Sequence, residues 1–175
     1  SQGKRLGVNL EDQRDRSTRK LRLSYFVYNW PQKSEMDITR YDLDNLVLWD
    51  SPSLGDGKEA DNRHANNIIN KLDETDENGN LLIDLVLVIL DGSTRDLGTS
   101  YELINRVIIP NLGKNKENRI LVAINQADVA MKGKFWDYEN NRPEPPLQKF
   151  LDEKVASVKR RIKEGTGVDV DPIYY

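Results

Sequence analysis

The chain has 175 residues, of which 37% are hydrophobic and 31% charged, and this length and composition suit one folded domain with its own core. Its 26 Lys and Arg against 29 Asp and Glu leave a net charge of -3, so the chain as a whole does not attract DNA or an anionic membrane. The absence of cysteine excludes disulfides and thiolate metal sites, and the single histidine, His64, leaves no basis for a multi-histidine metal site.

The first predicted elements follow a polar stretch, residues 1–17, that has no helical or strand periodicity and reads as a loop. Residues 21–28 and 44–49 are rich in β-forming residues and are predicted to pair as a hairpin. Apolar residues at helical spacing then predict a helix over residues 60–72.

The strongest strand signal is the apolar run at residues 82–90, which is typical of a strand buried on both faces of a parallel sheet. A helix is predicted over residues 99–109, ending at Pro110. A second buried strand is predicted over residues 119–124.

The last part of the chain begins with a polar connection at residues 131–146 that contains three prolines. An amphipathic helix with Gly165 as its stop follows, and residues 168–175 are predicted to form a final strand. Strands and helices alternate from Asp44 onward, which predicts an α/β fold of three layers with a mainly parallel sheet.

Polar motifs lie at the ends of these predicted strands, where ligands bind in open parallel sheets. Two motifs directly follow strands, and a third precedes the first strand. They are Asp50-Ser51-Pro52-Ser53, Asn125-Gln126-Ala127-Asp128 and Arg16-Ser17-Thr18-Arg19.

Taken in order, these motifs resemble those of the Ras-like P-loop GTPases, in particular the bacterial branch related to Era and to the YfjP-like, ribosome-associated GTPases. The resemblance covers about residues 13–175. It implies a single GTPase domain over 1–175, with 1–20 as a switch-I-like segment. It also implies a molecular switch that hydrolyses GTP, with Mg²⁺ and GTP or GDP as cofactors and a protein or ribosome as effector.

The resemblance assigns base recognition to the second motif. Asp128 would accept hydrogen bonds from the ring N–H and the exocyclic amine of guanine, and would reject adenine, which lacks that pair of donors. Asn125 would tie the base loop to its neighbours. Gln126 stands where the family has a lysine that packs over the base.

The resemblance assigns the metal and the γ-phosphate to the other two motifs. Asp50 would hold the hydration shell of Mg²⁺, since this ion keeps waters and needs few carboxylates. Thr18 would close over Mg²⁺ and the γ-phosphate, and the backbone N–H of Ser53 would contact that phosphate. Ser53 replaces a family glycine, and Leu54 stands where a water-orienting glutamine is usual.

The chain contains no Gly-x-x-x-x-Gly-Lys-[Ser/Thr] sequence for a phosphate-binding loop. In the Ras-like sheet, the strand that feeds this loop lies between the strand ending at Asp50 and the strand ending near Asp91. We therefore expect the first strand and the P-loop helix to be missing from this sequence. An empty or foreign-filled channel about 10 Å wide should then separate residues 46–50 from 84–90.

Two alternatives remain beside the GTPase hypothesis. A catalytically impaired pseudo-GTPase would serve as a protein-interaction domain, and a response-regulator-like or flavodoxin-like domain would use Asp50 as a strand-end acceptor. We also expect a cytoplasmic protein without a membrane span, a solvated His64, and high mobility in residues 1–17 when no nucleoside triphosphate is bound.

Overall fold

The computed structural model describes residues 23–28, 38–43, 45–51, 58–93 and 97–175. Six strands of this described part form one sheet in the order β2-β3-β1-β4-β5-β8. They are β1 (Leu23–Tyr28), β2 (Thr39–Leu43), β3 (Leu46–Asp50), β4 (Leu85–Asp91), β5 (Ile120–Asn125) and β8 (Ile173–Tyr174). Strands β2 and β3 pair in antiparallel fashion and the other neighbours are parallel, so the predicted mainly parallel α/β sheet with one edge hairpin is confirmed.

The helices connect the parallel strands. The main ones are α2 (Lys58–Asp73), α3 (Gly98–Leu103) and α5 (Pro145–Thr166). The shorter elements are the π-helical turn η1 (Ile104–Ile108), the 3-10 turns η2 (Ile109–Asn111) and η3 (Lys116–Asn118), α4 (Ala130–Gly133), and the small strands β6 (Trp136–Asp137) and β7 (Arg142–Pro143). None of the helices in this described part combines the length and apolar character needed to cross a membrane.

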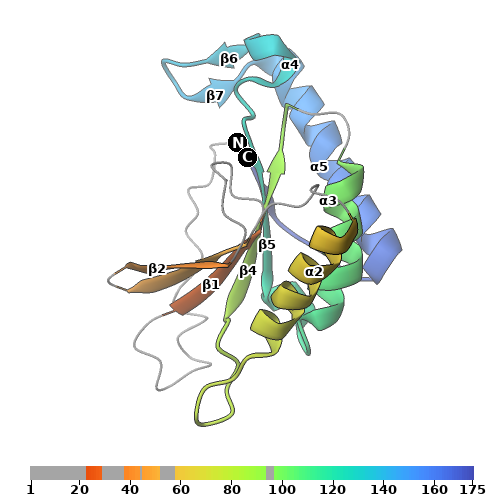
Figure 1. Cartoon of the computed structure of the whole chain (residues 1–175). Coiled ribbons are helices and arrows are strands. Elements are labelled where there is room, and N and C mark those ends of the chain that lie inside the picture. Colours follow the sequence, from red (N-terminus) through yellow and green to blue (C-terminus); the bar gives the residue numbers. More distant parts are fainter. Residues whose placement is uncertain (1–22, 29–37, 44, 52–57, 94–96) are drawn as a thin grey trace.

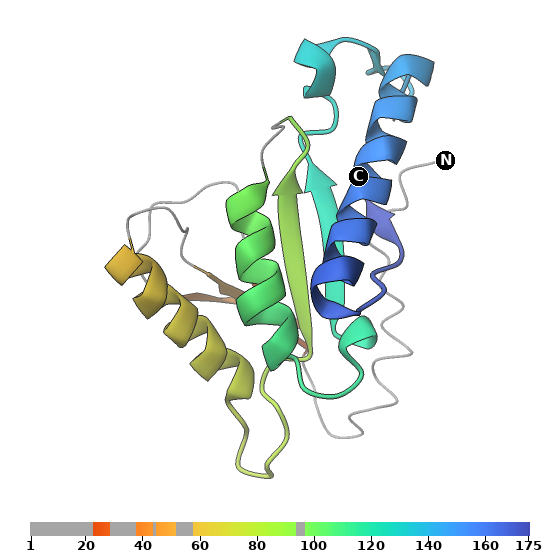
Figure 2. The same cartoon turned by 90° about the vertical axis from the view of Figure 1, so that its right-hand side faces the viewer.

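The three main helices lie on the same face of the sheet, as Figures 1 and 2 show. The chain moves across the sheet in one direction from β3 to β4, β5 and β8. Right-handed crossovers in one direction place their helices on one face. The main core lies between these helices and the sheet, and includes Phe26 of β1, Ile68 of α2 and Val158 of α5, none of which is exposed.

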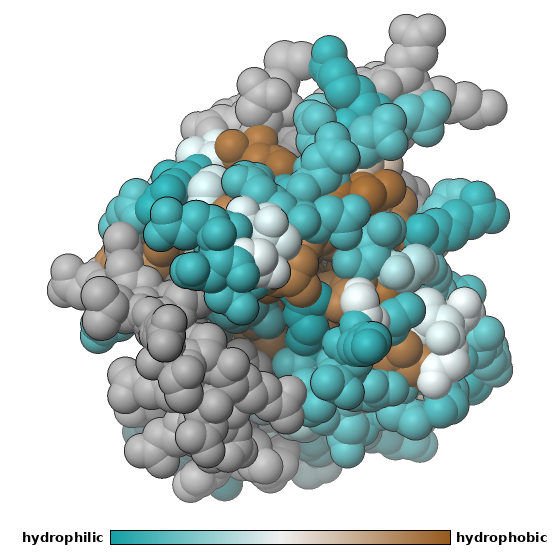
Figure 3. Space-filling model, turned by 90° about the horizontal axis from the view of Figure 1, so that it is seen from below, coloured by the Kyte–Doolittle hydropathy of each residue, from teal (hydrophilic) through white to brown (hydrophobic). Residues whose placement is uncertain are grey.

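The opposite face of the sheet carries a smaller apolar cluster. Tyr25 and Leu85 are buried there, with Leu46, Leu48 and Leu121 packed against them. The sequence predicted a sheet between two layers of helices. The main helices of the described residues form the layer on one face of the sheet. Seen from below, the described surface of the molecule is mostly hydrophilic with small hydrophobic areas between (Figure 3).

The position of β1 contradicts two predictions. It was expected to form the edge hairpin with residues 44–49, but it lies in the centre of the sheet and runs parallel to both β3 and β4. The expected empty channel between residues 46–50 and 84–90 is therefore wrong, because β1 occupies it. The first strand of the sheet is not missing from this chain.

The burial of β1 explains the error. Its four residues Tyr25 to Tyr28 are each at most 8% exposed, so this strand is covered on both faces, as central parallel strands are. The true partner of β3 in the hairpin is β2, whose residues from Arg40 to Leu43 are exposed. An exposed strand can remain at the edge of a sheet, whereas β1 cannot.

Several boundaries also differ from the prediction. Helical backbone continues past Pro110 to Asn111. Pro110 lies in the first turn of η2, where a residue needs no N–H to hydrogen-bond within the helix. Helix α5 ends at Gly167 and not at Gly165, with Gly167 in a left-handed conformation at φ 75°. The polar connection 131–146 contains the small β6–β7 hairpin.

Candidate functional site

Three strands of the sheet end in polar residues: β3 in Asp50, β4 in Asp91 and β5 in Asn125. The strand register pairs Asp91 with Asn125, so these two residues lie side by side. Asp50 is level with Leu87 of β4, because both pair with Val27. The carboxyl edge of the sheet is therefore staggered, with Asp50 set back from the ends of β4 and β5.

The stagger separates the two predicted parts of the site. Asp91 and Asn125 lie four residues beyond the level of Asp50, which is roughly 13 Å along the strands. Asp50 and Asn125 are also three strand spacings apart across the sheet, about 14 Å. Asp50, which was predicted to bind the metal, is thus not in contact with Asn125, which was predicted to support the base. A ligand that reaches both residues must be extended.

The residues predicted to recognise the base occur together in residues 125–128, called the loop 125–128 here, which begins with the last residue of β5. Asn125 and Gln126 are exposed, and Asp128 is half-buried. Gln126 has a left-handed φ of 56°, which turns the chain sharply after the strand. Ala127 is buried and packs with Leu147 and Leu151 of α5. Apolar packing on α5 therefore holds the back of the loop while its polar side chains face solvent.

The end of β4 is tied to this loop through Gly92 and Ser93. The Gly92 N–H donates to the Asn125 carbonyl at 2.7 Å. The Ser93 hydroxyl lies 2.6 Å from Asp91 Oδ1 and 3.3 Å from Gln126 Oε1, and its backbone N–H donates to the same Asp91 oxygen at 2.8 Å. The ends of β4 and β5 are therefore joined by both backbone and side-chain contacts.

Gly92 also receives a contact from α5. The Lys154 ammonium group donates to the Gly92 carbonyl at 2.8 Å. Burial lowers the pKa of Lys154, and the neighbouring Asp91 carboxylate opposes that shift. The Lys154 ammonium group therefore contacts the same residue that links the end of β4 to the loop 125–128.

The end of β3 has a different environment. Asp50 is half-buried, and the next residue, Ser51, is fully buried. The Ser51 N–H donates to the Val27 carbonyl at 3.0 Å, which anchors the chain as it leaves β3, next to the end of β1. The Ser51 hydroxyl has no hydrogen-bond partner among the described residues.

Within the described residues, no group of three or more Asp, Glu or His side chains could hold a metal ion. Asp50 is the carboxylate at the end of β3, and Mg²⁺ commonly uses one or two carboxylates together with water and substrate phosphates. A single carboxylate of this kind would suit a Mg²⁺ ion that a phosphate also binds, and not an ion held by the described side chains alone.

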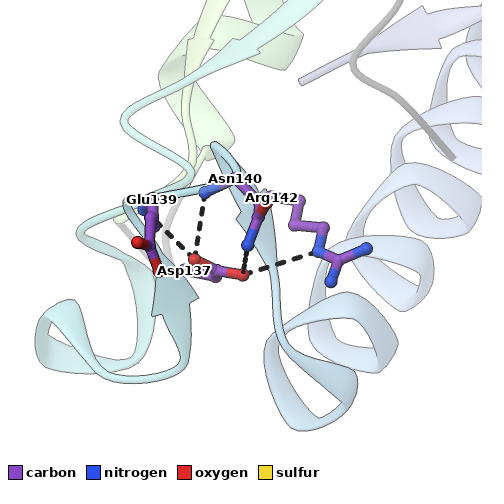
Figure 4. A network of polar contacts seen from close by, with 4 residues as sticks. All are labelled: Asp137, Glu139, Asn140 and Arg142. Atoms are coloured by element: carbon purple, nitrogen blue, oxygen red, sulfur yellow. Dashed lines mark hydrogen bonds and ion pairs between the residues drawn. The ribbon is translucent and has the colours of Figure 1, made fainter.

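The polar connection between the loop 125–128 and α5 is organised around Asp137, at the end of the molecule beyond β4 and β5 (Figures 1 and 4). Its carboxylate accepts hydrogen bonds from the Asn140 side chain at 2.7 Å and from the N–H groups of Glu139 and Asn140, both at 3.1 Å. Arg142 approaches it to 3.5 Å. The Asn140 side chain is the largest of the causes that lower the pKa of Asp137.

The structure leaves some predicted site residues outside its description. Thr18, Ser53 and Leu54 lie outside the described residues, as does the proposed switch segment 1–20. The expected mobility of residues 1–17 falls there too. The predictions for these residues stay predictions.

His64 contradicts its prediction. It was expected to be solvated, but it is 1% exposed within α2, and its Nδ1 has no hydrogen-bond partner among the described residues. The prediction failed because most of the residues around His64 in α2 are polar, so the sequence did not show that His64 lies on the buried face of the helix.

Sequence reasoning did not single out Gly92, Ser93 or Lys154. The available signals were the polar residues that directly follow the apolar run 82–90, and a lysine within the apolar stripe of α5.

No protein-family model matches the chain, and no curated protein matches it. Among solved structures, the chain is similar to one described as a probable GTP-binding protein, EngB, with 17% identity and a TM-score of 0.40. The match covers 82% of this chain and 85% of that chain. A likeness of this size does not identify a function.

Proposed function

We propose that the chain is a guanine-nucleotide-binding domain of the Ras-like P-loop type, related to the Era and YfjP-like branch. The observation that carries the proposal is the position of Asn125-Gln126-Ala127-Asp128 in one ordered loop after β5. The sheet order supports it, since β1 lies between β3 and β4, where the resemblance expects the strand that feeds the phosphate loop.

Asp128 is the proposed base-reading residue. Its carboxylate can accept from both the ring N–H and the exocyclic amine of guanine, whereas adenine would leave the acceptors unpaired. Asn125 and Gln126 would support the loop beside it. The offset between this loop and Asp50 suits an extended ligand with a base at one end and phosphates at the other.

The phosphate end would involve Asp50, Thr18 and Ser53. Asp50 would hold waters around a Mg²⁺ ion that the nucleotide phosphates also bind, and the ion would neutralise developing charge on those phosphates. Thr18 and Ser53 would contact the γ-phosphate. A protein or ribosome would be the effector of such a switch, in the cytoplasm.

One observation favours the second candidate, a pseudo-GTPase that serves as an interaction domain. Because β1 holds the central position, the phosphate-binding sequence should follow Tyr28. Residues 29–38 contain the pair Lys33-Ser34, which resembles the end of a phosphate-binding sequence, but they contain no glycine. Without glycine, the backbone N–H groups of a loop approach phosphates less closely. We therefore propose that guanine recognition is stronger than catalysis and that GTP hydrolysis is slow.

Calorimetric titration of the chain with GDP and with ADP, with and without Mg²⁺, tests base recognition. We expect GDP to bind more tightly than ADP, and Asp128→Ala to weaken GDP binding about a hundredfold, because two hydrogen bonds to a carboxylate are lost. Glu153→Ala, which removes an exposed carboxylate from α5, is the matched control and should bind as before.

A second substitution makes this test sharper. Asp128→Asn should prefer xanthosine diphosphate, because xanthine replaces the exocyclic amine with a carbonyl that the Asn amide can donate to. Equal affinities of the unmodified chain for GDP and ADP would contradict the proposal. Release of phosphate from GTP, compared between the unmodified chain and Asp50→Asn, separates a slow GTPase from a pseudo-GTPase without turnover.

A further inference from the structure

The loop 125–128 is connected to α5 through a relay of two hydrogen bonds centred on Gly92. The Gly92 N–H donates to the Asn125 carbonyl at 2.7 Å, and the Gly92 carbonyl accepts from the Lys154 ammonium at 2.8 Å. Asn125 is the first residue of the loop. The position of the loop relative to β4 therefore depends on a backbone group that Lys154 holds from the other side.

Gly92 permits this arrangement because it has no side chain. A Cβ atom at this position would lie 2.7 Å from the Asn125 carbonyl oxygen and 2.9 Å from Cγ2 of Ile124. Both distances are shorter than real Cβ contacts. The backbones of β4 and β5 thus approach more closely at Gly92 than any other residue type allows.

Lys154 occupies an unusual place on α5. The residues Leu147, Leu151, Val158 and Ile162 form one core-facing stripe, and none of these four side chains is exposed. Lys154 lies within this stripe, between the cluster behind the loop and the main core. Lys154 is half-buried there, so its ammonium group loses part of its hydration, and the hydrogen bond to the Gly92 carbonyl compensates for that loss. Packing alone therefore does not account for a lysine here.

We propose that Lys154 is a positioning residue that sets the selectivity of the loop 125–128 for guanine. It would do so by holding Gly92, and through it Asn125, at a fixed distance from α5, so that Asp128 meets both donors of the base. Two-point hydrogen bonding tolerates little displacement, since a shift of about 0.5 Å already degrades such a site. This inference rests on the function proposed above.

Three substitutions of Lys154 test the inference. Lys154→Met keeps the length of the side chain and removes the donor, Lys154→Gln is too short to reach Gly92, and Lys154→Arg keeps a donor. Lys149→Met is the matched control, because Lys149 is an exposed lysine on the same helix. Circular dichroism establishes that each variant is folded, and Lys154→Gln replaces Lys154→Met if the latter fails to fold.

The first measurement is amide hydrogen exchange without nucleotide, in peptides that cover residues 90–93 and 124–128. We expect Lys154→Met to speed exchange in both peptides about tenfold, which is the scale of one lost hydrogen bond to a charged group. Lys154→Arg should exchange much as the unmodified chain does, and Lys149→Met should show no change. Unchanged exchange in both peptides of Lys154→Met and Lys154→Gln would overturn the inference.

The second measurement is the ratio of affinities for GDP and inosine diphosphate, which lacks the exocyclic amine that Asp128 would bind. Lys154→Met should lower this ratio about fivefold, and Lys154→Arg should restore it. General destabilisation would weaken both nucleotides equally and leave the ratio unchanged, so an unchanged ratio overturns the selectivity role. If the unmodified chain bound GDP and ADP equally, the proposed function would be wrong, and the selectivity role of Lys154 with it. This holds even if hydrogen exchange shows that Lys154 holds Gly92 in place.

Discussion

At the scale of single residues, two long basic side chains hydrogen-bond to backbone carbonyls at the ends of strands. Arg119 illustrates this at the opposite end of β5. Its guanidinium donates to the carbonyls of Leu112 and, at 2.8 Å, of Ile83, and burial lowers its pKa. Lys154 does the same for Gly92. Both side chains therefore tie separate segments of the chain to one another.

Two glycines allow a direct comparison of close contacts. Gly92→Ala should lower the free energy of unfolding by about 1–3 kcal/mol, because the new Cβ would meet the backbone oxygen of Asn125, which cannot move alone. Gly165→Ala should change it by less than about 1 kcal/mol. There the obstacle is the side chain of Asn105, which can rotate away, and alanine favours a helix over glycine. Urea unfolding of both variants measures the difference, and equal effects would contradict this account.

Asp137 carries a prediction about pH. Its folded-state pKa lies below the ordinary value of 3.8, chiefly because the Asn140 side chain donates to the carboxylate. The contribution of these hydrogen bonds to the stability of the β6–β7 hairpin is therefore present above about pH 4 and is lost as pH falls through the lowered pKa. Carboxyl NMR titration should show the lowered pKa directly.

Two variants separate the causes of this shift. Asn140→Ala should raise the pKa of Asp137 toward its ordinary value, because it removes the largest contribution. Arg142→Gln should have a smaller effect, because this exposed charge is the smallest of the causes that lower the pKa of Asp137. A larger shift from Arg142→Gln than from Asn140→Ala would show that charge attraction and not hydrogen bonding controls this carboxylate.

At the scale of elements, α5 supports both the core and the candidate site. Leu147 and Leu151 in its first half pack under the loop 125–128, while Val158 and Ile162 in its second half pack in the main core. Because one helix carries both contacts, the loop has a fixed position relative to the sheet. The same face of α5 presents Lys154 to Gly92 at the junction between the two clusters.

The contrast between the central strand β1 and the edge strand β2 gives a further prediction. Phe26→Ala should destabilise the protein by about 3–5 kcal/mol, because Phe26 is fully buried in the main core. Tyr41→Ala on β2 should cost less than about 0.5 kcal/mol, because Tyr41 is 47% exposed. Urea unfolding decides the matter. Similar effects of the two substitutions would place β1 at an edge, as the sequence predicted.

At the scale of the whole molecule, strand order determines where a ligand can bind. Successive crossovers in one direction place α2, α3 and α5 on one face, and leave the carboxyl ends of β3, β4 and β5 at one edge (Figure 1). Polar residues that are far apart in the sequence meet at that edge. The stagger of the strands then separates Asp50 from the loop 125–128 and suits an extended ligand.

The sequence by itself determined the α/β class, the parallel strands at residues 82–90 and 119–124, and the amphipathic helix that became α5. These elements are long and strongly patterned, so local chemistry alone identifies them. It also placed residues 125–128 at the carboxyl edge of the sheet, because a polar motif that directly follows a buried parallel strand lies at that edge.

Only the tertiary structure decided the place of β1, the burial of His64 and the contacts of Gly92 and Lys154. A short apolar run such as Tyr25 to Tyr28 can pair with any neighbour, and its partner depends on which faces the rest of the chain covers. The relay from Lys154 through Gly92 to Asn125 joins α5, the residue that follows β4, and the end of β5. Its existence depends on distances of a few ångströms between backbones, and local sequence patterns do not specify such distances.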